Sequence, residues 1–240
     1  MSRDSGIFIT ATDTNVGKTV VTAALGQVLQ SDGRKIAVCK PVQSGSTIDD
    51  PTGDTMLLRT WSEVESNLSL INIYSFEAPL APLAAARNTQ TEIILETIIE
   101  RVAYLETKCD TILVEGAGGL LVPMGESWTI ADLAHALNYP LVVVARSTLG
   151  TVNHTLLTVK MARSLGLRVA AVVLNTESPS AMPVNPGTQT NKSLIQEFGN
   201  VPVIGPLPWV KEGIDTFSIR DKICPFFDAK EIRKLADTAQ

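Results

Sequence analysis

Short apolar runs alternate with longer amphipathic segments along the chain. The runs are apolar almost throughout, which is typical of strands that helices cover on both faces. We predict six strands, at Gly6–Thr10, Lys35–Lys40, Thr111–Glu115, Leu141–Ala145, Val169–Asn175 and Val201–Ile204. Helices are predicted at Lys18–Ser31, Thr91–Lys108, Thr129–Leu137, Thr151–Leu167 and Lys192–Phe198. The alternation predicts an α/β fold with a doubly wound, mainly parallel sheet flanked by helices, in which ligands bind at the carboxyl ends of the strands.

Two stretches interrupt this alternation. Pro41–Ser69 and Thr176–Asn191 are rich in Ser, Thr, Pro, Gly and Asp. Each begins where a predicted strand ends. We expect both to be long loops, and loops in that position are often functional.

Composition narrows the class of protein. The 240 residues, 45% of them apolar, are expected to form a single domain over residues 1–240. A net charge of −5 argues against nucleic-acid or membrane-surface partners. No apolar stretch reaches the ~18 residues of a membrane span, and the N-terminus lacks the apolar region of a signal peptide. Three cysteines without CxxC spacing argue against disulfides and zinc sites. We therefore expect a cytoplasmic protein.

The first predicted strand leads into a candidate phosphate-binding loop. The segment Ala11-Thr12-Asp13-Thr14-Asn15-Val16-Gly17-Lys18-Thr19 nearly fits GxxxxGK[ST], with alanine in place of the first glycine. In this motif backbone N–H groups surround the phosphates, the Lys reaches the β- and γ-phosphates, and the Ser or Thr hydroxyl binds Mg²⁺. The alternative is a plain strand-turn-helix, but the position after the first strand of an α/β chain favours a phosphate loop. Ala11 suits the first position if its φ is negative, because a small side chain is then sufficient.

Two positions in the sequence indicate which nucleotide is bound and which type of nucleotide-binding protein this is. A GTPase would carry an Asn-Lys-x-Asp type of base reader near the fifth strand, whereas this chain has Asn175-Thr176-Glu177-Ser178, so ATP is favoured. ATPases of the ParA and iron-protein type carry a Lys directly after the first motif position. Here that residue is Thr12, which argues against a partner-switching ATPase.

Candidate Mg²⁺ ligands lie after two other strands. Glu115 ends the third predicted strand and precedes a glycine-rich segment that lets backbone approach a ligand. Asp49, Asp50 and Asp54 follow the second strand. Periodicity does not choose among these three aspartates, and the cluster is equally typical of a solvated turn.

Lys40 ends the second predicted strand and precedes Pro41, which favours an extended backbone. At this carboxyl end it would supply a second ammonium beside Lys18. Two lysines and Mg²⁺ form an electrostatic clamp for a transferring phosphoryl group or a developing oxyanion. The alternative is a lysine whose head reaches water while its stem packs on the strand end.

The helix predicted at Thr151–Leu167 contains no Asp or Glu, although acids are favoured in the first turn of a helix. It begins Leu149-Gly150-Thr151-Val152-Asn153, with only hydroxyl and amide groups as polar side chains. Its N-terminus is therefore free to receive an anion such as a substrate carboxylate. An ordinary Thr N-cap is the alternative.

These motifs, with Lys40-Pro41-Val42-Gln43-Ser44-Gly45 and Pro208-Trp209, resemble the dethiobiotin synthetase family from about residue 6 to 215. The resemblance implies an ATP- and Mg²⁺-dependent ligase that closes a ureido ring on 7,8-diaminononanoate (7,8-diaminopelargonate) with CO₂, in biotin biosynthesis. It implies a carbamate that attacks the γ-phosphate of ATP, and a carbamic-phosphoric anhydride that the second amine attacks, with release of ADP and phosphate. It also implies a homodimer with its sites at the interface.

The resemblance further assigns roles to residues. It places Thr19, Asp54 and Glu115 on Mg²⁺ and makes Lys18 and Lys40 the catalytic lysines. ATP would contact Asn15, Val16, Gly17, Lys18, Thr19, Val20, Asp54, Glu115, Gly116, Ala117 and Gly118, with Asn175, Thr176, Pro208, Trp209 and Val210 around the adenine. Substrate contacts would be Thr14 and Ser44 and, in a loop that serves the partner subunit, Gly150, Thr151, Val152 and Asn153.

Two other functions are open at this point. A cobyrinic-acid-type amide ligase shares the phosphate-loop architecture, but that class couples to a glutaminase domain for which 240 residues leave no room. A nucleotide-switched ATPase would hydrolyse ATP slowly and respond to a protein partner.

Overall fold

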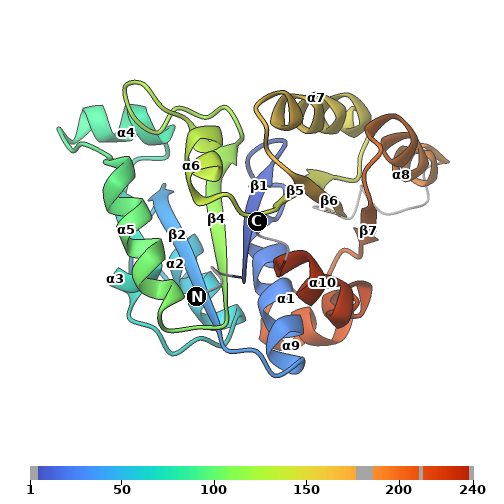
Figure 1. Cartoon of the computed structure of the whole chain (residues 1–240), viewed down its shortest axis with the longest axis horizontal. Coiled ribbons are helices and arrows are strands. Elements are labelled where there is room, and N and C mark those ends of the chain that lie inside the picture. Colours follow the sequence, from blue (N-terminus) through green and yellow to red (C-terminus); the bar gives the residue numbers. More distant parts are fainter. Residues whose placement is uncertain (1–4, 177–185, 211–212, 238–240) are drawn as a thin grey trace.

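The computed structural model describes residues 5–176, 186–210 and 213–237. Within these residues seven strands form one sheet in the order β3-β2-β4-β1-β5-β6-β7, and all neighbouring strands are parallel (Figure 1). The strands are β1 (Ser5–Ala11), β2 (Ile36–Ser44), β3 (Asn72–Phe76), β4 (Thr111–Gly119), β5 (Leu141–Arg146), β6 (Val169–Asn175) and β7 (Val203–Leu207). The predicted parallel α/β fold is confirmed.

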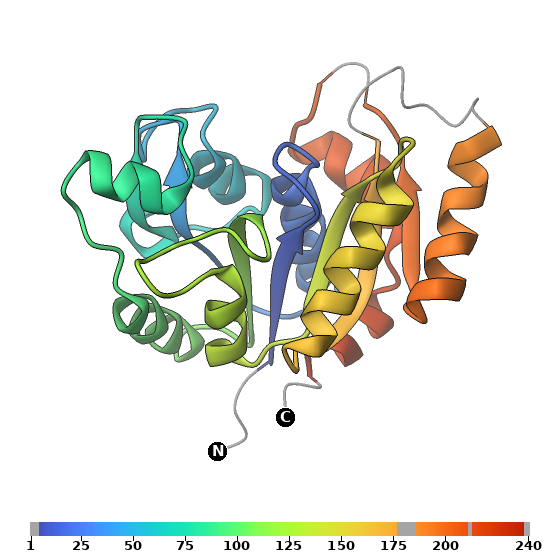
Figure 2. The ribbon, with the colours of Figure 1, turned by 90° about the horizontal axis from the view of Figure 1, so that it is seen from above.

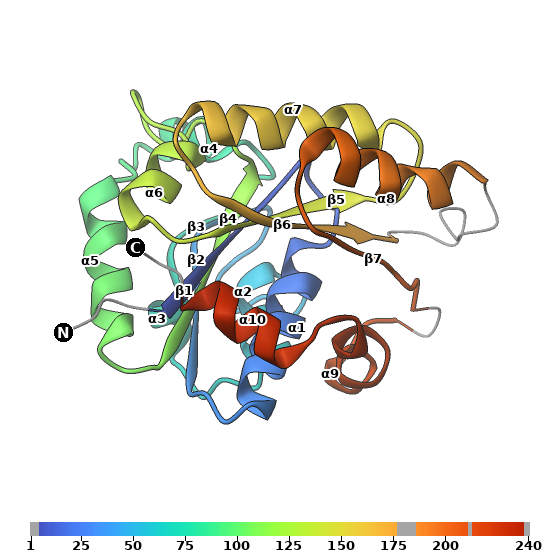
Figure 3. The same ribbon diagram turned by 45° about the vertical axis from the view of Figure 1, so that its right-hand side comes forward.

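Helices cover both faces of the sheet (Figure 3). One face packs against α4 (Pro82–Asn88), α5 (Leu95–Glu106), α6 (Ile130–Leu137), α7 (Thr151–Ser164) and α8 (Pro186–Gly199). The other packs against α1 (Lys18–Ser31), α2 (Asp54–Trp61), α3 (Leu68–Ile71) and α10 (Ala229–Ala236). Before α10 the chain forms α9 (Thr216–Ser218), a π-helix (Ile219–Ile223) and a 3₁₀-helix (Cys224–Phe226). Apolar strands are explained by this arrangement, because both of their faces are buried.

The winding of the sheet reverses beside β1. The helix after β1 lies on one face, whereas those after β4 and β5 lie on the other. Figure 2 shows the loops after β1 and β2 at the same upper edge of the sheet. In doubly wound sheets a crevice forms at such a reversal, outside the carboxyl ends of the strands.

The prediction of a loop at Pro41–Ser69 is wrong. β2 continues to Ser44, α2 lies within the stretch, and α3 begins at its end. Polar residues typical of turns dominate its first half, and α2, with only eight residues, is too short to give a clear helical pattern among them. Pro41 lies where β2 stops pairing with β4 and begins to pair with β3, so the strand passes through it.

Other boundaries also differ from the predictions. α8 begins at Pro186, inside the stretch Thr176–Asn191 that was predicted as a loop, while residues 177–185 lie outside the described part of the chain. α5 begins at Leu95 rather than Thr91, because Ile94 is extended. Pairing of β7 begins at Val203 rather than Val201. The sequence did not predict β3, α4, α9 or α10; all four elements are short, and β3 lies at the edge of the sheet. No helix of the described residues is long and apolar enough to cross a bilayer.

Candidate functional site

A cavity of about 380 Å³ lies at the carboxyl ends of β1, β2 and β4. The phosphate loop, the start of α1, the end of β2, α2 and the end of β4 surround it. Its lining consists of Thr14, Asn15, Gly17, Lys18, Thr19, Val20, Lys40, Val42, Ser44, Asp54, Leu57, Trp61, Glu115, Ala117 and Gly118. Twelve of these fifteen residues were predicted as site residues from the sequence.

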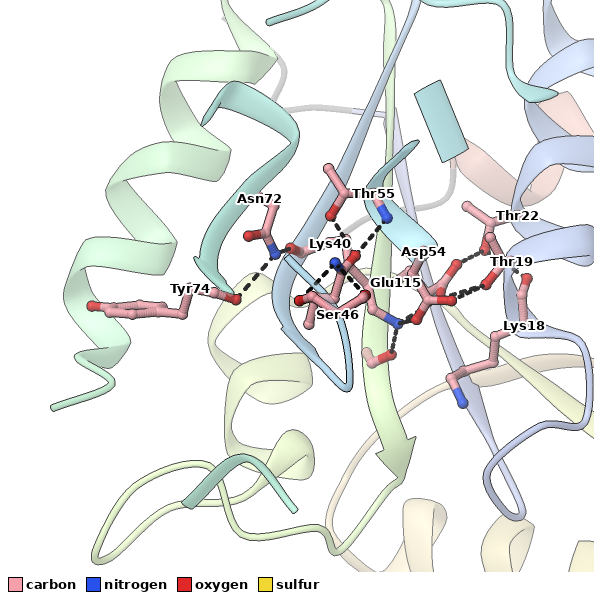
Figure 4. A network of polar contacts seen from close by, with 12 residues as sticks. Lys18, Thr19, Thr22, Lys40, Ser46, Asp54, Thr55, Asn72, Tyr74 and Glu115 are labelled. Atoms are coloured by element: carbon pink, nitrogen blue, oxygen red, sulfur yellow. Dashed lines mark hydrogen bonds and ion pairs between the residues drawn. The ribbon is translucent and has the colours of Figure 1, made fainter. Parts of the chain in front are cut away.

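Lys40 and Glu115 stand where β2 and β4 part. The last residues that pair between these strands are Cys39 and Val114, and Lys40 and Glu115 follow them directly. Lys40 Nζ lies 2.7 Å from Glu115 Oε1 and 2.7 Å from Asp54 Oδ2 (Figure 4). Both Lys40 and Glu115 are buried. Lys40 is therefore not a lysine that reaches into water, and that alternative is wrong.

The two lysines of this cluster have opposite electrostatic environments. Burial by itself lowers the pKa of Lys40, but the carboxylates of Glu115 and Asp54 overcome this and raise it above its ordinary value. In return, Lys40 lowers the pKa of Asp54. Burial, followed by repulsion from Lys40, lowers the pKa of Lys18 to about 8. Among the described residues Lys18 has no carboxylate within ion-pair distance. The site thus contains a buried cation that an anionic ligand would stabilise.

Oxygen atoms converge beside the phosphate loop. Thr19 Oγ1 donates to Asp54 Oδ1 at 3.1 Å and to Glu115 Oε1 at 3.2 Å. Hydroxyl and carboxylate oxygens are ligands suited to Mg²⁺, which proteins hold through one or two carboxylates plus substrate phosphates. The residues therefore fit the metal that the sequence implied.

Thr22 belongs to this cluster and was not predicted. Its Oγ1 donates to Glu115 Oε2 at 3.0 Å and to the carbonyl of Lys18 at 2.9 Å. Helical spacing could have indicated it: Thr22 lies three residues after Thr19 and four after Lys18, so the three residues share one face of α1. Thr22 fixes the carboxylate that Lys40 and Thr19 share.

The phosphate loop has the backbone that its motif requires. Gly17 has φ 92°, and a Cβ added there would lie 2.1 Å from Asn175 Nδ2, so no larger residue fits without displacement. Asn175 Nδ2 donates to the Val16 carbonyl at 3.0 Å. Ala11 ends β1, is fully buried and has no positive φ, which meets the condition for alanine at this position. α1 has no acid in its first turn, so its N–H groups are available to an anion.

The structure separates the three aspartates. Asp50 Oδ1 accepts hydrogen bonds at 2.8 Å from Thr52 N and Oγ1 and closes a turn. Asp54 begins α2 and faces Lys40 and Thr19. Asp49 is exposed. Asp50 therefore belongs to a turn, whereas Asp54 faces the candidate site.

Other predicted residues do not line the cavity. Val16 and Gly116 lie directly beside it, and the Gly116 carbonyl is 3.3 Å from Lys40 Nζ. Asn175 and Thr176 are buried at the end of β6, where Thr176 Oγ1 lies 3.3 Å from Ser147 Oγ. Two predicted segments are absent from the cavity lining, namely Pro208, Trp209 and Val210 after β7, and Gly150, Thr151, Val152 and Asn153 at the start of α7.

Three apolar lining residues were missed: Val42, Leu57 and Trp61. Val42 belongs to the part of β2 beyond Pro41, and the other two belong to α2. This region was predicted as a loop, and the prediction therefore included no helix face that could line a site. The i, i+4 spacing of Leu57 and Trp61 would have indicated one helix face.

A phosphate loop at a helix N-terminus, two buried lysines, and carboxylates on β4 and at the start of α2 define a P-loop nucleotide-binding protein. Solved structures share this fold: MinD in the Aquifex aeolicus MinC:MinD complex (TM-score 0.59, 16% identity, covering 97% of this chain and 94% of that one) and Pyrococcus furiosus MinD (TM-score 0.54, 18% identity, covering 98% of each). A family model described as an AAA domain matches residues 5–214.

Sequence relatives define the family more narrowly. The ATP-dependent dethiobiotin synthetase BioD of Bacillus thuringiensis (strain Al Hakam) is 45% identical over 205 residues, which cover 85% of this chain and 84% of the relative. The corresponding protein of Bacillus subtilis (strain 168) is 37% identical over 203 residues, covering 85% and 87%. The chain belongs to the dethiobiotin synthetase family.

Proposed function

We propose that this protein forms dethiobiotin from 7,8-diaminononanoate, CO₂ and ATP, with Mg²⁺, and releases ADP and phosphate. The observation that carries the proposal is the Lys40 ammonium, which two carboxylates hold beside the phosphate loop. Phosphoryl transfer depends on positioning and charge neutralisation rather than on a nucleophilic side chain. The cluster offers these two properties.

Each part of the cluster has a role in this reaction. Lys18 and the N–H groups at the start of α1 bind the triphosphate. Lys40 neutralises the carbamate made from one amine and CO₂, and then the phosphoryl group that the carbamate takes from ATP. Thr19, Asp54 and Glu115 would hold Mg²⁺, which supplies charge neutralisation on the phosphates when bound. The second amine then attacks the carbamic-phosphoric anhydride and expels phosphate.

Substrate contacts come from the rim of the cavity. Thr14 and Ser44 line it and are exposed, so they can meet the diamine or its carbamate. Asn175, Thr176, Pro208, Trp209 and Val210 would form the adenine pocket. In support of this, Asn175 already contacts the phosphate loop through the Val16 carbonyl.

We further propose a homodimer that works in the cytoplasm. Two leucines are exposed to solvent at α7, namely Leu149, which precedes the helix and is 90% exposed, and Leu157, which lies on it and is 61% exposed. Gly150 lies in open space with φ 93°, and the first turn of α7 has no acid. This N-terminus would receive the diamine carboxylate in the partner's site. All three cysteines are free, as expected in a reducing compartment.

The test is incorporation of labelled bicarbonate into an acid-stable product. We expect label to be fixed only when the diamine, ATP and Mg²⁺ are all present. ATP hydrolysis without the diamine and without fixed label would contradict the ligase and indicate a nucleotide switch instead.

A further inference from the structure

Gln43 is a buried amide on β2 whose hydrogen-bonding groups all find partners. The residue is 2% exposed. Its Oε1 accepts from Thr55 N and from Thr55 Oγ1, both at 2.7 Å. Its Nε2 donates to Ser46 Oγ at 2.8 Å and to the Thr47 carbonyl at 2.9 Å. One side chain thus ties the segment after β2 and the start of α2 to the strand that carries Lys40.

These bonds do for α2 what an N-cap does for other helices. The residue before α2 is Gly53, which has no side chain to accept from the first N–H groups. Gln43 Oε1 accepts from Thr55 N in its place. A Cβ on Gly53 would lie 2.7 Å from Ser46 Oγ and 2.9 Å from Gln43 Nε2, so a side chain there would displace the Ser46 hydroxyl and the Gln43 amide.

The residue held in this way is the neighbour of Asp54. The Asp54 side chain is 42% exposed, so burial does not fix it. Its position relative to Lys40 and Thr19 depends on where the first turn of α2 lies. Figure 4 shows Thr55 and Ser46 in the same network of polar contacts as Lys40, Asp54 and Glu115.

We propose that Gln43 is a positioning residue that sets the Asp54 carboxylate against Lys40 and the phosphate loop, so that the metal-nucleotide complex meets a preformed oxygen ligand. The inference rests on the proposed role of Asp54. Metal-dependent nucleotide binding, rather than product formation, is the property that Gln43 controls.

The chain offers a matched control at the other end of the same helix. Gln27 is also a buried amide, 6% exposed, and its Nε2 donates to the Trp61 carbonyl at 2.7 Å. Gln27 holds the last residue of α2, far along the helix from Asp54. Gln27→Leu and Gln43→Leu therefore remove the same group from opposite ends of one helix.

The test is calorimetric titration with a non-hydrolysable ATP analogue, with Mg²⁺ and with a chelator in its place. We expect Mg²⁺ to strengthen binding to the unsubstituted protein, and Gln43→Leu to lose about three- to tenfold of that gain, the effect of one or two lost hydrogen bonds. Binding in the chelator is expected to change less than about twofold. Gln27→Leu should keep the full gain even if its melting temperature falls.

Each outcome decides the inference. A full Mg²⁺ gain in Gln43→Leu, or an equal loss in Gln27→Leu, would overturn the positioning role and leave the proposed reaction intact. No gain in the unsubstituted protein would overturn the metal assignment and the inference with it. If Gln43→Leu does not fold, Thr55→Val, which removes only the hydroxyl bond, decides: a partial loss supports the role and a full gain refutes it.

Discussion

The Lys40 ammonium illustrates how single residues carry the chemistry of this protein. A buried cation is costly, and here two carboxylates at 2.7 Å compensate it. The sequence predicted this lysine as the last residue of a strand, whereas β2 continues beyond it to Ser44. It did not predict the partners, because Asp54 and Glu115 are distant in the chain and meet Lys40 only where β2 and β4 part.

Lys40→Gln removes the charge but keeps an amide that can donate to Glu115. Because Lys40 is proposed to neutralise the transferring group, we expect synthetase turnover to fall by about a hundredfold or more. Circular dichroism would establish that the variant is folded. Lys35→Gln, an exposed lysine directly before β2, is the control and should retain activity. Near-normal turnover in Lys40→Gln would exclude a catalytic role.

At the scale of elements, glycines and capping residues made several boundaries predictable. α1 begins at Lys18 after Gly17, and α7 begins at Thr151 after Gly150, as expected, because both glycines have left-handed backbones that mark a helix boundary. α2 also follows a glycine, but Gly53 has an extended backbone with φ −75° and no side chain to cap the helix. Its start depends on Gln43, which lies twelve residues from Thr55, and no window of sequence shows that bond.

The capping of α6 has a pH-dependent consequence. The Asp132 carboxylate accepts from Thr129 N and Oγ1, both at 2.7 Å, and these bonds lower its pKa. We expect Asp132→Ala to lower the free energy of unfolding by about 1 kcal/mol at neutral pH. A carboxyl group whose pKa is lower in the folded state stabilises the folded protein at pH values above its unfolded pKa of about 3.9. This stabilisation is lost as the pH falls through the pKa of the folded state.

Denaturant titrations at several pH values check this expectation. The difference between Asp132→Ala and the unsubstituted protein should vanish toward pH ~2. Glu100→Ala, an exposed carboxylate on α5, is the control and should change stability by less than about 0.5 kcal/mol. A difference that persists undiminished in acid would show that the effect does not come from the charged cap.

At the scale of the whole molecule, the acidic chain concentrates positive charge in one place. The net charge is −5, yet Lys18, Lys40 and the N-terminus of α1 lie around one cavity. A negative net charge argues against polyanion partners, but it does not prevent this one positive site from binding a small anion. The assignment of one domain to residues 1–240 stays a prediction.

The proposed dimer is tested by mass in solution. Each chain has a mass of 25.7 kDa, and we expect the unsubstituted protein to measure as two chains. Leu157→Glu replaces an exposed leucine of α7 with a charge and should shift the mass toward one chain and reduce synthetase activity. Phe217→Glu, at a residue 69% exposed on α9, should do neither. A single chain in the unsubstituted protein would contradict the dimer.

The sequence by itself determined the alternation of strands and helices, the phosphate loop and the residue types at strand ends, because these depend on local periodicity and on motifs of a few residues. Tertiary structure decided which aspartate joins Lys40, how Thr22 and Gln43 support the site, and where α2 lies. Those features depend on contacts between residues far apart in the chain, such as Lys40 with Glu115 and Val16 with Asn175. The physical reason is that parallel strands bring their carboxyl ends to one edge, whatever their separation in sequence.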